Sequence, residues 1–517
     1  MGLLKSIATV GGFTLISRVL GFIRDILIAG LLGAGTLADV FFVAFKLPNL
    51  FRRLFAEGAF NAAFVPIFSG LIETDGKNAA QEFAEEALAG LLWTLLGFVV
   101  LFELLMPFIM VGFAPGFMGN AAKFDLAVLL TRITFPYLLF ISLVSLMGGV
   151  LNSLGRFAAA AATPIFLNIC LIGAILVLTT MMPTAAHALS WGVAGAGVVQ
   201  FVWLYQACAR AGMRLRFRRP RMTARVKTLL FRMLPLAVGA GIYQVNLLID
   251  TILASLLPDG SISYLFFADR LNQFPLGVIG LAVGTALLPL LSRQVKRGEQ
   301  AAAMHSQNRA LEFSLLLTLP AAAALMVMAE PVIRTLFERG AFGAGETSAT
   351  AAALVFYASG LPAYVLVKSL AVGFFAREDT ATPIKIGFAA VLVNIVLSIA
   401  LMGPFLHVGL AAASAISAWV NALTLAVVLS RRGQLQLDDR LRRRFPRALA
   451  ASALMAAAVW WLAGSASAQL AAAEPTRAMA LALVILFGAT IYAGAAWAFG
   501  AASPNDLKRL YRGGATP

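Results

Sequence analysis

The sequence is poor in charged residues, in cysteine and in histidine. Only 12% of its 517 residues are charged, about half the share found in soluble globular domains, so a soluble fold is excluded. Its two cysteines, Cys170 and Cys208, stand apart from each other and from the three histidines. We therefore expect no disulfide framework and no metal site, and interpret both cysteines as core residues.

Motifs of several other protein classes are missing. No Gly-Lys-Ser/Thr triplet of a Walker A motif occurs, so we expect no ATP hydrolysis and no cofactor. No cluster of acids or metal ligands suits an intramembrane enzyme, so we predict that the chain is not an enzyme and assign no catalytic residue. The first apolar run contains charges and precedes no small-residue cleavage site, which argues against a cleavable signal peptide.

Long apolar runs make up most of the chain. Hydrophobic residues account for 60% of it, and its mean hydropathy is +0.87. A bilayer core needs about 20 apolar residues per helix, and we count fourteen such runs. They lie near 6–30, 36–56, 86–112, 124–151, 160–181, 187–208, 233–256, 262–291, 309–329, 346–375, 383–402, 408–430, 447–467 and 478–500. The sequence thus predicts an all-α polytopic membrane protein with fourteen transmembrane helices.

Basic residues gather in alternate loops. Residues 210–232 hold nine Lys or Arg and no acid, and residues 431–447 hold seven arginines and two aspartates. Loops 30–36 and 402–408 hold neither Lys nor Arg. Because Lys and Arg collect on the cytoplasmic side, we expect both termini there, including the basic tail of Lys508, Arg509 and Arg512. This pattern favours anionic lipids, and not nucleic acid, as the partner of the basic loops.

The chain resembles itself at an offset near 225 residues. DILIAGLLGAG from Asp25 aligns with DTILASLLPDG from Asp250, and Val65-Pro66 aligns with Leu288-Pro289. Each copy holds six predicted helices, so the two lobes run parallel and are related by a pseudo-twofold axis along the membrane normal, with the substrate cleft between them. The predicted domains are an N-lobe at 1–209, a basic cytoplasmic linker at 210–232, a C-lobe at 233–430, and residues 431–517 with a basic loop, an appended helix pair and a cytoplasmic tail.

Ionisable residues occur inside the predicted helices, where each costs at least ~2.5–3.5 kcal/mol on insertion scales. Arg18 and Asp25 share one face of the first helix, and Asp39, Lys46 and Arg53 recur every seven residues in the second. The six cations of this set outnumber its three acids; the residues are Arg18, Arg24, Lys46, Arg52, Arg53 and Arg270 against Asp25, Asp39 and Asp269.

Two interpretations of these charges remain open. Arg18 with Asp25, and Asp39 with Lys46, could be structural ion pairs, and Arg52 with Arg53 could anchor a helix at the headgroups. The surplus of cations instead favours a hydrated cavity for an anion. Arginine suits phosphate, since its planar guanidinium makes two parallel hydrogen bonds.

Four stretches carry a resemblance to a known family. SRVLGFIRDILIAGLLGAG at Ser17–Gly35 precedes ADVFFVAFKLPNLFRRLFAEGAFNAAFVPIF at Ala38–Phe68, and FADRLNQFPLGVIG at Phe267–Gly280 and DTATP at Asp379–Pro383 follow. Over essentially its whole length the chain resembles the MviN/MurJ family of lipid II flippases, within a superfamily of multidrug and polysaccharide exporters.

The resemblance implies a function and a site. Members move undecaprenyl-diphosphate-linked peptidoglycan precursor from the cytoplasmic to the periplasmic leaflet of the bacterial inner membrane, and the appended helix pair forms a groove for the lipid tail. The substrate-binding residues implied here, with Arg53 added from the polar stripe, are Arg18, Arg24, Asp25, Asp39, Arg52, Arg53 and Arg270. Asp250 matches a sodium-binding aspartate of some relatives. Gln273 departs from relatives that carry a carboxylate there.

The expected mechanism is alternating access, driven by Na+ or by the membrane potential, with the cell-wall synthesis machinery as a further expected partner. Two rival transporters remain. One exports another lipid-linked oligosaccharide, which charge alone does not separate from lipid II. The other is a cation-coupled multidrug exporter, whose site should favour carboxylates over arginines.

Overall fold

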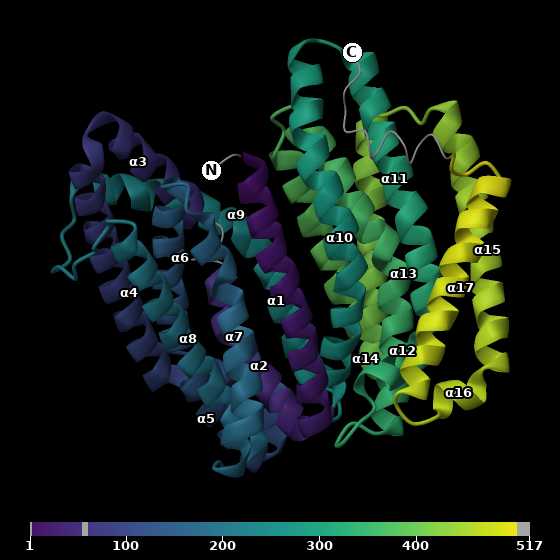
Figure 1. The fold of residues 1–517 in the computed structure, drawn as a ribbon, viewed down its shortest axis with the longest axis horizontal. Helices are drawn as coiled ribbons and strands as arrows, with labels where there is room; N and C mark the ends of the chain where they lie inside the picture. Colours follow the sequence, from purple (N-terminus) through teal and green to yellow (C-terminus); the bar gives the residue numbers. More distant parts are fainter. Residues whose placement is uncertain (1–2, 54–59, 504–517) are drawn as a thin grey trace. The chain divides into compact units, whose positions relative to one another are not determined.

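The computed structural model describes residues 3–53 and 60–503, which are almost entirely helical, with no strand in these two ranges (Figure 1). The predicted basic tail at 504–517 and residues 54–59 of the arginine-containing motif lie outside the described residues. The rest divides into two compact units. Unit 1 contains the described residues up to Ser263 together with Arg339–Phe342, and unit 2 contains Tyr264–Glu338 and the described residues from Gly343 onward.

Unit 1 begins with the polar first pair of helices and ends at the start of α10. Its helices are α1 (Leu3–Leu32), α2 (Thr36–Phe51), α3 (Asn61–Thr74), α4 (Gly76–Phe113), η2 (Pro115–Gly119), α5 (Ala121–Thr134), α6 (Tyr137–Ser153), α7 (Phe157–Val177), η3 (Leu178–Thr180), α8 (Ala185–Arg210) and α9 (Ala224–Ser255). Side chains cap several of them. The oxygens of Asn120, Thr184 and Thr223 accept backbone N–H groups in the first turns of α5, α8 and α9.

Unit 2 begins inside a helix that starts in unit 1. Its helices are α10 (Ser261–Lys296), α11 (Gln300–Val327), α12 (Ala329–Phe337), α13 (Ala344–Phe375), α14 (Ala381–Arg431), α15 (Asp439–Ser465), α16 (Ser467–Ala471) and α17 (Thr476–Ala498). The long α14 is two helices joined by a kink at Leu406, whose φ of 50° is left-handed. This kink separates the predicted runs 383–402 and 408–430.

In their described residues, thirteen of the fourteen predicted runs each lie mainly on one helix, and the run 124–151 is divided between α5 and α6. Among the described residues, nine helices are long and apolar enough to cross a membrane, and they cover ten of the predicted runs because α14 contains two. The other four runs correspond to α1, α2, α9 and α10, the helices that carry most of the intramembrane charge. The all-helical membrane fold is therefore confirmed, and the count of fourteen stays a prediction.

The helix boundaries recur at the offset of the sequence repeat. α2 and α10 begin at residues 36 and 261, α4 and α11 at 76 and 300, and α7 and α14 at 157 and 381. The two copies thus share a helix pattern as well as scattered residues.

The division into units differs from the predicted lobes. The N-lobe was predicted to end at 209, whereas unit 1 also contains α9, which packs against α3 and α4. The two units are defined by which residues pack together, whereas the predicted lobes are defined by the sequence repeat. The unit boundaries therefore do not test the lobe boundaries, which stay a prediction.

Three helices were not predicted: α3, α12 and α16. Each has at most fourteen residues, fewer than a membrane span requires. α4 also begins ten residues before its predicted run, at Gly76, because the Ala, Glu and Lys residues that precede the apolar stretch favour helix.

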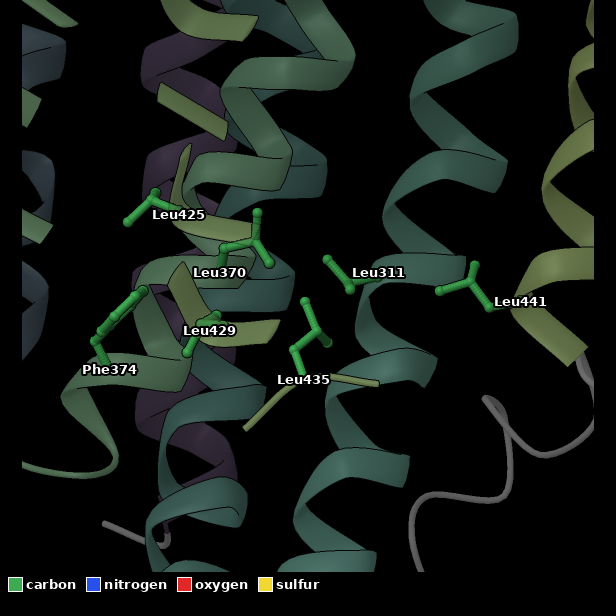
Figure 2. Packing of buried hydrophobic residues seen from close by; sticks show 7 residues of the cluster. All are labelled: Leu311, Leu370, Phe374, Leu425, Leu429, Leu435 and Leu441. Atoms are coloured by element: carbon green, nitrogen blue, oxygen red, sulfur yellow. The ribbon is translucent and has the colours of Figure 1, made fainter. Parts of the chain in front are cut away.

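The core of unit 2 joins the appended helices to the repeat. Figure 2 shows side chains from α11, α13, α14, α15 and the segment between α14 and α15 packed in one buried cluster; they are Leu311, Leu370, Phe374, Leu425, Leu429, Leu435 and Leu441. In Figure 1 α15 and α17 run alongside each other and α16 joins them at one end. Gly488 permits their close approach, because a Cβ there would lie 2.7 Å from Val459.

The DTATP motif forms the turn between α13 and α14. Asp379 accepts hydrogen bonds from the backbone N–H (2.9 Å) and hydroxyl (2.7 Å) of Thr382, as an N-cap residue does. Arg432, at the far end of α14, donates to Asp379 at 2.7 Å and lies over the Phe374 ring. The motif therefore ties both ends of α14 together at one side of unit 2.

Replacing Asp379 by Ala should lower the free energy of unfolding by about 1 kcal/mol, since α14 loses its cap. Hydrogen bonds from Thr382, and then Arg432, lower the pKa of Asp379 from 3.8 to about 2. Its stabilising contribution is present above pH 3.8 and is lost as the pH falls through about 2. Thermal unfolding in detergent should therefore show a constant difference from wild type between about pH 5 and 8.

The exposed aspartate Asp125 in α5 provides the control. Asp125→Ala should shift the unfolding temperature less than Asp379→Ala. Equal shifts, or a difference that changes across that pH range, would contradict the capping role.

Candidate functional site

Arg24 on α1 is held by a carboxylate and by a second helix. Its Nη2 and Nε donate to Asp25 Oδ1 at 2.7 and 3.0 Å, and its Nη1 donates to Asn168 Oδ1 on α7 at 2.9 Å. Asn168 in turn donates to the Ser17 carbonyl at 2.9 Å. Arg24 is 7% exposed and Asp25 is 1% exposed. The guanidinium is thus neutralised here, and Asp25 pairs with Arg24 instead of with Arg18.

Asp39 on α2 accepts three hydrogen bonds from the start of α10. Its carboxylate takes the N–H of Gly260 at 2.7 Å, the N–H of Ser263 at 2.9 Å and the hydroxyl of Ser263 at 2.6 Å. The first N–H groups of a helix have no partner within it, so Asp39 caps α10 from another helix. The negative charge also suits the positive end of the helix dipole. These contacts are structural, and binding of substrate by Asp39 stays a prediction.

Lys123 on α5 is a buried cation that the sequence analysis missed. Its Nζ lies 2.6 Å from Asp259 Oδ1, 4.0 Å from Asp39 Oδ2 and 4.0 Å from the centre of the Phe117 ring. The hydroxyl of Thr36 also donates to Asp259. The hydrogen bonds from Lys123 and Thr36 hold the pKa of Asp259 below its usual value. Nothing in the local sequence of Lys123 signals this role, because both aspartates come from distant segments.

The other predicted cations of unit 1 differ in exposure. Arg18 on α1 is exposed, and so is Arg53, just after α2. Arg52 is half-buried, and its Nε donates to Asn49 Oδ1 at 3.1 Å. Lys46 is half-buried on α2, one turn before Asn49. Several cationic side chains thus lie on α1 and α2 and directly after α2.

Asp250 occupies the position on α9 that the repeat equates with Asp25. It is half-buried, and its Oδ2 accepts from Asn246 Nδ2 at 3.4 Å, one turn earlier. Its use for ion coupling stays a prediction.

Unit 2 carries Arg270 near the start of α10. Arg270 is half-buried, with its guanidinium carbon 5.4 Å from the centre of the Phe266 ring. Gln273 donates to Asp269 one turn away. Of the predicted site residues, the structure brings Arg24 and Asp25 into contact. A common chamber for the whole set stays a prediction.

Comparisons with known proteins agree on one family. The sequence model of the family "Lipid II flippase MurJ" matches residues 28–477. A Rhizobium meliloti (strain 1021) protein named "Probable lipid II flippase MurJ" is 47% identical, with 100% of this chain and 97% of the relative covered. A Burkholderia cenocepacia protein named "Lipid II flippase MurJ" is 35% identical, with 97% and 98% covered.

Solved structures give the same match. A structure titled "Lipid II flippase MurJ, inward closed conformation" superposes with a TM-score of 0.79 at 25% identity, covering 97% of this chain and 99% of that one. A multidrug MATE transporter of the MOP superfamily in an inward-facing conformation superposes with a TM-score of 0.67, covering 80% and 94%. Its identity is 12%, so it shows a shared fold alone.

Replacing Asn168 by Ala should lower the free energy of unfolding by about 1–3 kcal/mol, because the buried Arg24 loses an acceptor and the Ser17 carbonyl loses a donor. Thermal unfolding of the purified protein measures the change. Asn152→Ala, at an exposed position near the end of α6, is the matched control and should change little. If both variants unfold at the same temperature, Asn168 does not hold Arg24.

Replacing Asp39 by Asn should lower the free energy of unfolding by roughly 1.5–3 kcal/mol. The amide is uncharged, and its NH2 group cannot accept a hydrogen bond as the second carboxylate oxygen does. Ser263→Ala removes one donor of the three and should have a smaller effect in the same unfolding assay. If Asp39→Asn leaves the stability unchanged, or if Ser263→Ala lowers it by as much as Asp39→Asn, Asp39 does not cap α10.

Proposed function

We propose that this chain, which belongs to the MurJ family of lipid II flippases, moves lipid II across the membrane by alternating access with its intramembrane arginines as the diphosphate site. The observation that carries the function is the family match over the whole chain at 47% identity. The fold agrees, since the chain superposes on a structure titled "Lipid II flippase MurJ, inward closed conformation" with a TM-score of 0.79.

The substrate poses an electrostatic problem. Its diphosphate and sugar head cannot cross hydrocarbon unaided, because an unpaired anion buried there costs tens of kcal/mol by Born reasoning. Guanidinium groups in a hydrated cavity would remove most of that barrier, while the polyprenyl tail stays in the lipid. Arg18, Arg52 and Arg53 supply such groups on unit 1, and Arg270 supplies one on unit 2.

The paired state of Arg24 fits a site that awaits its ligand. A lone guanidinium at bilayer depth is costly, and Asp25 compensates it at 2.7 Å. We infer that the diphosphate takes over this compensation when it binds, with Asn168 keeping Arg24 in position. The exchange of one anion for another lets the empty carrier remain folded without a free buried charge.

The proposed energy source for transport is the membrane potential, which acts on the negative charge of the substrate. An inside-negative potential favours outward movement of anionic charge by about 2.3 kcal/mol per charge per 100 mV. Sodium binding at Asp250 is a second proposed source, supported by the half-buried carboxylate on α9.

The proposed topology places both termini and the basic loops in the cytoplasm of a bacterium, with the helices in its inner membrane. The basic loops then face the anionic headgroups of the cytoplasmic leaflet. The enzymes of cell-wall synthesis, which use the flipped substrate, are the proposed protein partners.

Arg24→Ala and Arg270→Ala should each reduce flipping roughly thirty-fold or more, because each removes a charged contact to the diphosphate. The measurement is the amount of lipid II on the outer leaflet in a host depleted of its own flippase and supplied with the variant. Protein level in the membrane is measured in parallel, since Arg24→Ala leaves Asp25 buried without its arginine.

Two further variants keep the test decisive. Arg24→Ala combined with Asp25→Asn removes the charge without leaving an unpaired acid, and it should still fail to flip lipid II. Arg297→Ala, an exposed loop arginine, is the control and should flip normally. Normal outer-leaflet lipid II in the Arg24 and Arg270 variants, at normal protein level, would refute the proposed site.

A further inference from the structure

The segment between α8 and α9 is bound along the first turns of α4. The side chain of Gln81 donates to the Arg214 carbonyl at 2.9 Å, and the N–H of Arg216 donates to Glu85 Oε1 at 3.2 Å. Glu85 is 1% exposed, although it lies in a helix segment that precedes the membrane span. Met213 and Leu215 are buried beside it. The backbone of this loop is therefore docked on unit 1.

Acidic side chains of this region neutralise two of the loop's cations. Arg218 lies 2.6 Å from Glu85 Oε2 and 3.3 Å from Glu82 Oε1. Farther along, Arg225 lies 3.1 Å from Asp75 Oδ2. Thr223, which caps α9, donates to Glu86 at 2.8 Å. Residues 210–232 themselves hold no acid, and these carboxylates come from α4 and the turn before it, more than a hundred residues earlier.

The remaining cations of residues 214–232 are not part of these ion pairs. All of them are exposed, and within the described ranges none forms an ion pair; they are Arg214, Arg216, Arg219, Arg221, Lys227 and Arg232. Apolar side chains are exposed among them. Phe217 is 52% exposed, Met222 is 72% exposed and Phe231 is 68% exposed. Cationic and apolar groups thus share one surface directly before the membrane span of α9.

We propose that residues 214–232, here called the basic ledge, form a binding surface for the anionic phospholipid headgroups of the cytoplasmic leaflet. The inference rests on the cytoplasmic topology of the proposed function. Six uncompensated cations attract anionic headgroups, and the exposed Phe and Met side chains can enter the interface between headgroups and acyl chains. Nucleic acid would satisfy the charges, but the apolar side chains lie beside a transmembrane helix, where lipid is the neighbour.

The docked backbone distinguishes this surface from a disordered basic tail. Glu85 and Glu82 hold the loop through Arg218, so the backbone that carries the other cations is already ordered and less ordering entropy is lost when lipid binds. The ledge leads directly into α9, whose first turns carry Lys227 and Phe231 with the ammonium 6.0 Å from the ring centre. Bound lipid would therefore fix the depth of α9 in the leaflet.

The test places a fluorescent probe on the ledge of the full chain. A Cys170→Ala, Cys208→Ala, Met222→Cys protein, labelled with an environment-sensitive dye and purified in detergent, is titrated with short-chain phosphatidylglycerol. Short-chain phosphatidylcholine, inorganic phosphate and a single-stranded oligonucleotide are the comparison ligands. We expect a blue shift of the dye emission with phosphatidylglycerol at much lower concentration than with phosphatidylcholine, and none with phosphate.

Variants assign the response to the ledge. Arg219→Gln with Arg221→Gln should raise the half-maximal concentration of phosphatidylglycerol about 25-fold, from about five-fold per basic residue. Arg442→Gln with Arg443→Gln, an exposed pair before the span of α15, is the matched control and should leave the titration unchanged. Glu85→Gln should weaken binding by releasing the loop, even though it adds positive charge.

Several outcomes would overturn the proposal. They are equal responses to the two lipids, an unchanged titration in the Arg219/Arg221 variant, a stronger titration in Glu85→Gln, or a response to oligonucleotide at lower concentration than to lipid. The flippase proposal fails separately. If Arg24→Ala flips lipid II normally while the probe still reports phosphatidylglycerol, the diphosphate site is wrong and the ledge stands.

Discussion

A charge at bilayer depth is tolerated only when another charge, a hydrogen bond or water compensates it, and unit 1 is built around that compensation. Arg24 is balanced by Asp25 and positioned by Asn168 from α7. Asp39 is balanced by the first N–H groups of α10. Just outside the predicted spans, Lys123 is balanced by Asp259 in the same way. These contacts join segments far apart in the chain. Compensation of buried charge therefore also holds helices of unit 1 in place.

The internal repeat preserves helices more faithfully than charges. The helix starts recur at the same offset, but Ile249 stands where Arg24 stands in the first copy. Asp25 consequently has an arginine beside it, whereas Asp250 accepts a hydrogen bond from Asn246. The two copies thus share a helix pattern but differ in the polar residues that they carry at equivalent positions.

The arginines of the basic loops fall into two groups, those that pair with a protein carboxylate and those that do not. Some arginines of the basic loops meet protein carboxylates, as Arg218 meets Glu85 and Arg444 meets Glu312, and they stabilise helix packing. Others, such as Arg219 and Arg221, have no such partner in the described chain and remain available to lipid. The count of 40 Lys and Arg residues therefore overstates the number of cationic side chains that are without a protein carboxylate.

The sequence by itself determined the helical membrane class, the positions of the long helices and the family, since apolar runs, prolines and motif residues are local properties. It also named the charged residues at bilayer depth. Only the tertiary structure decided their partners. Helix periodicity paired Arg18 with Asp25, because neighbours in sequence do not face each other on a helix, yet the long Arg24 side chain folds back to Asp25 and reaches Asn168. Lys123 had no local signal at all. An ion pair depends on which distant helices pack together, and that information is absent from any single stretch of the chain.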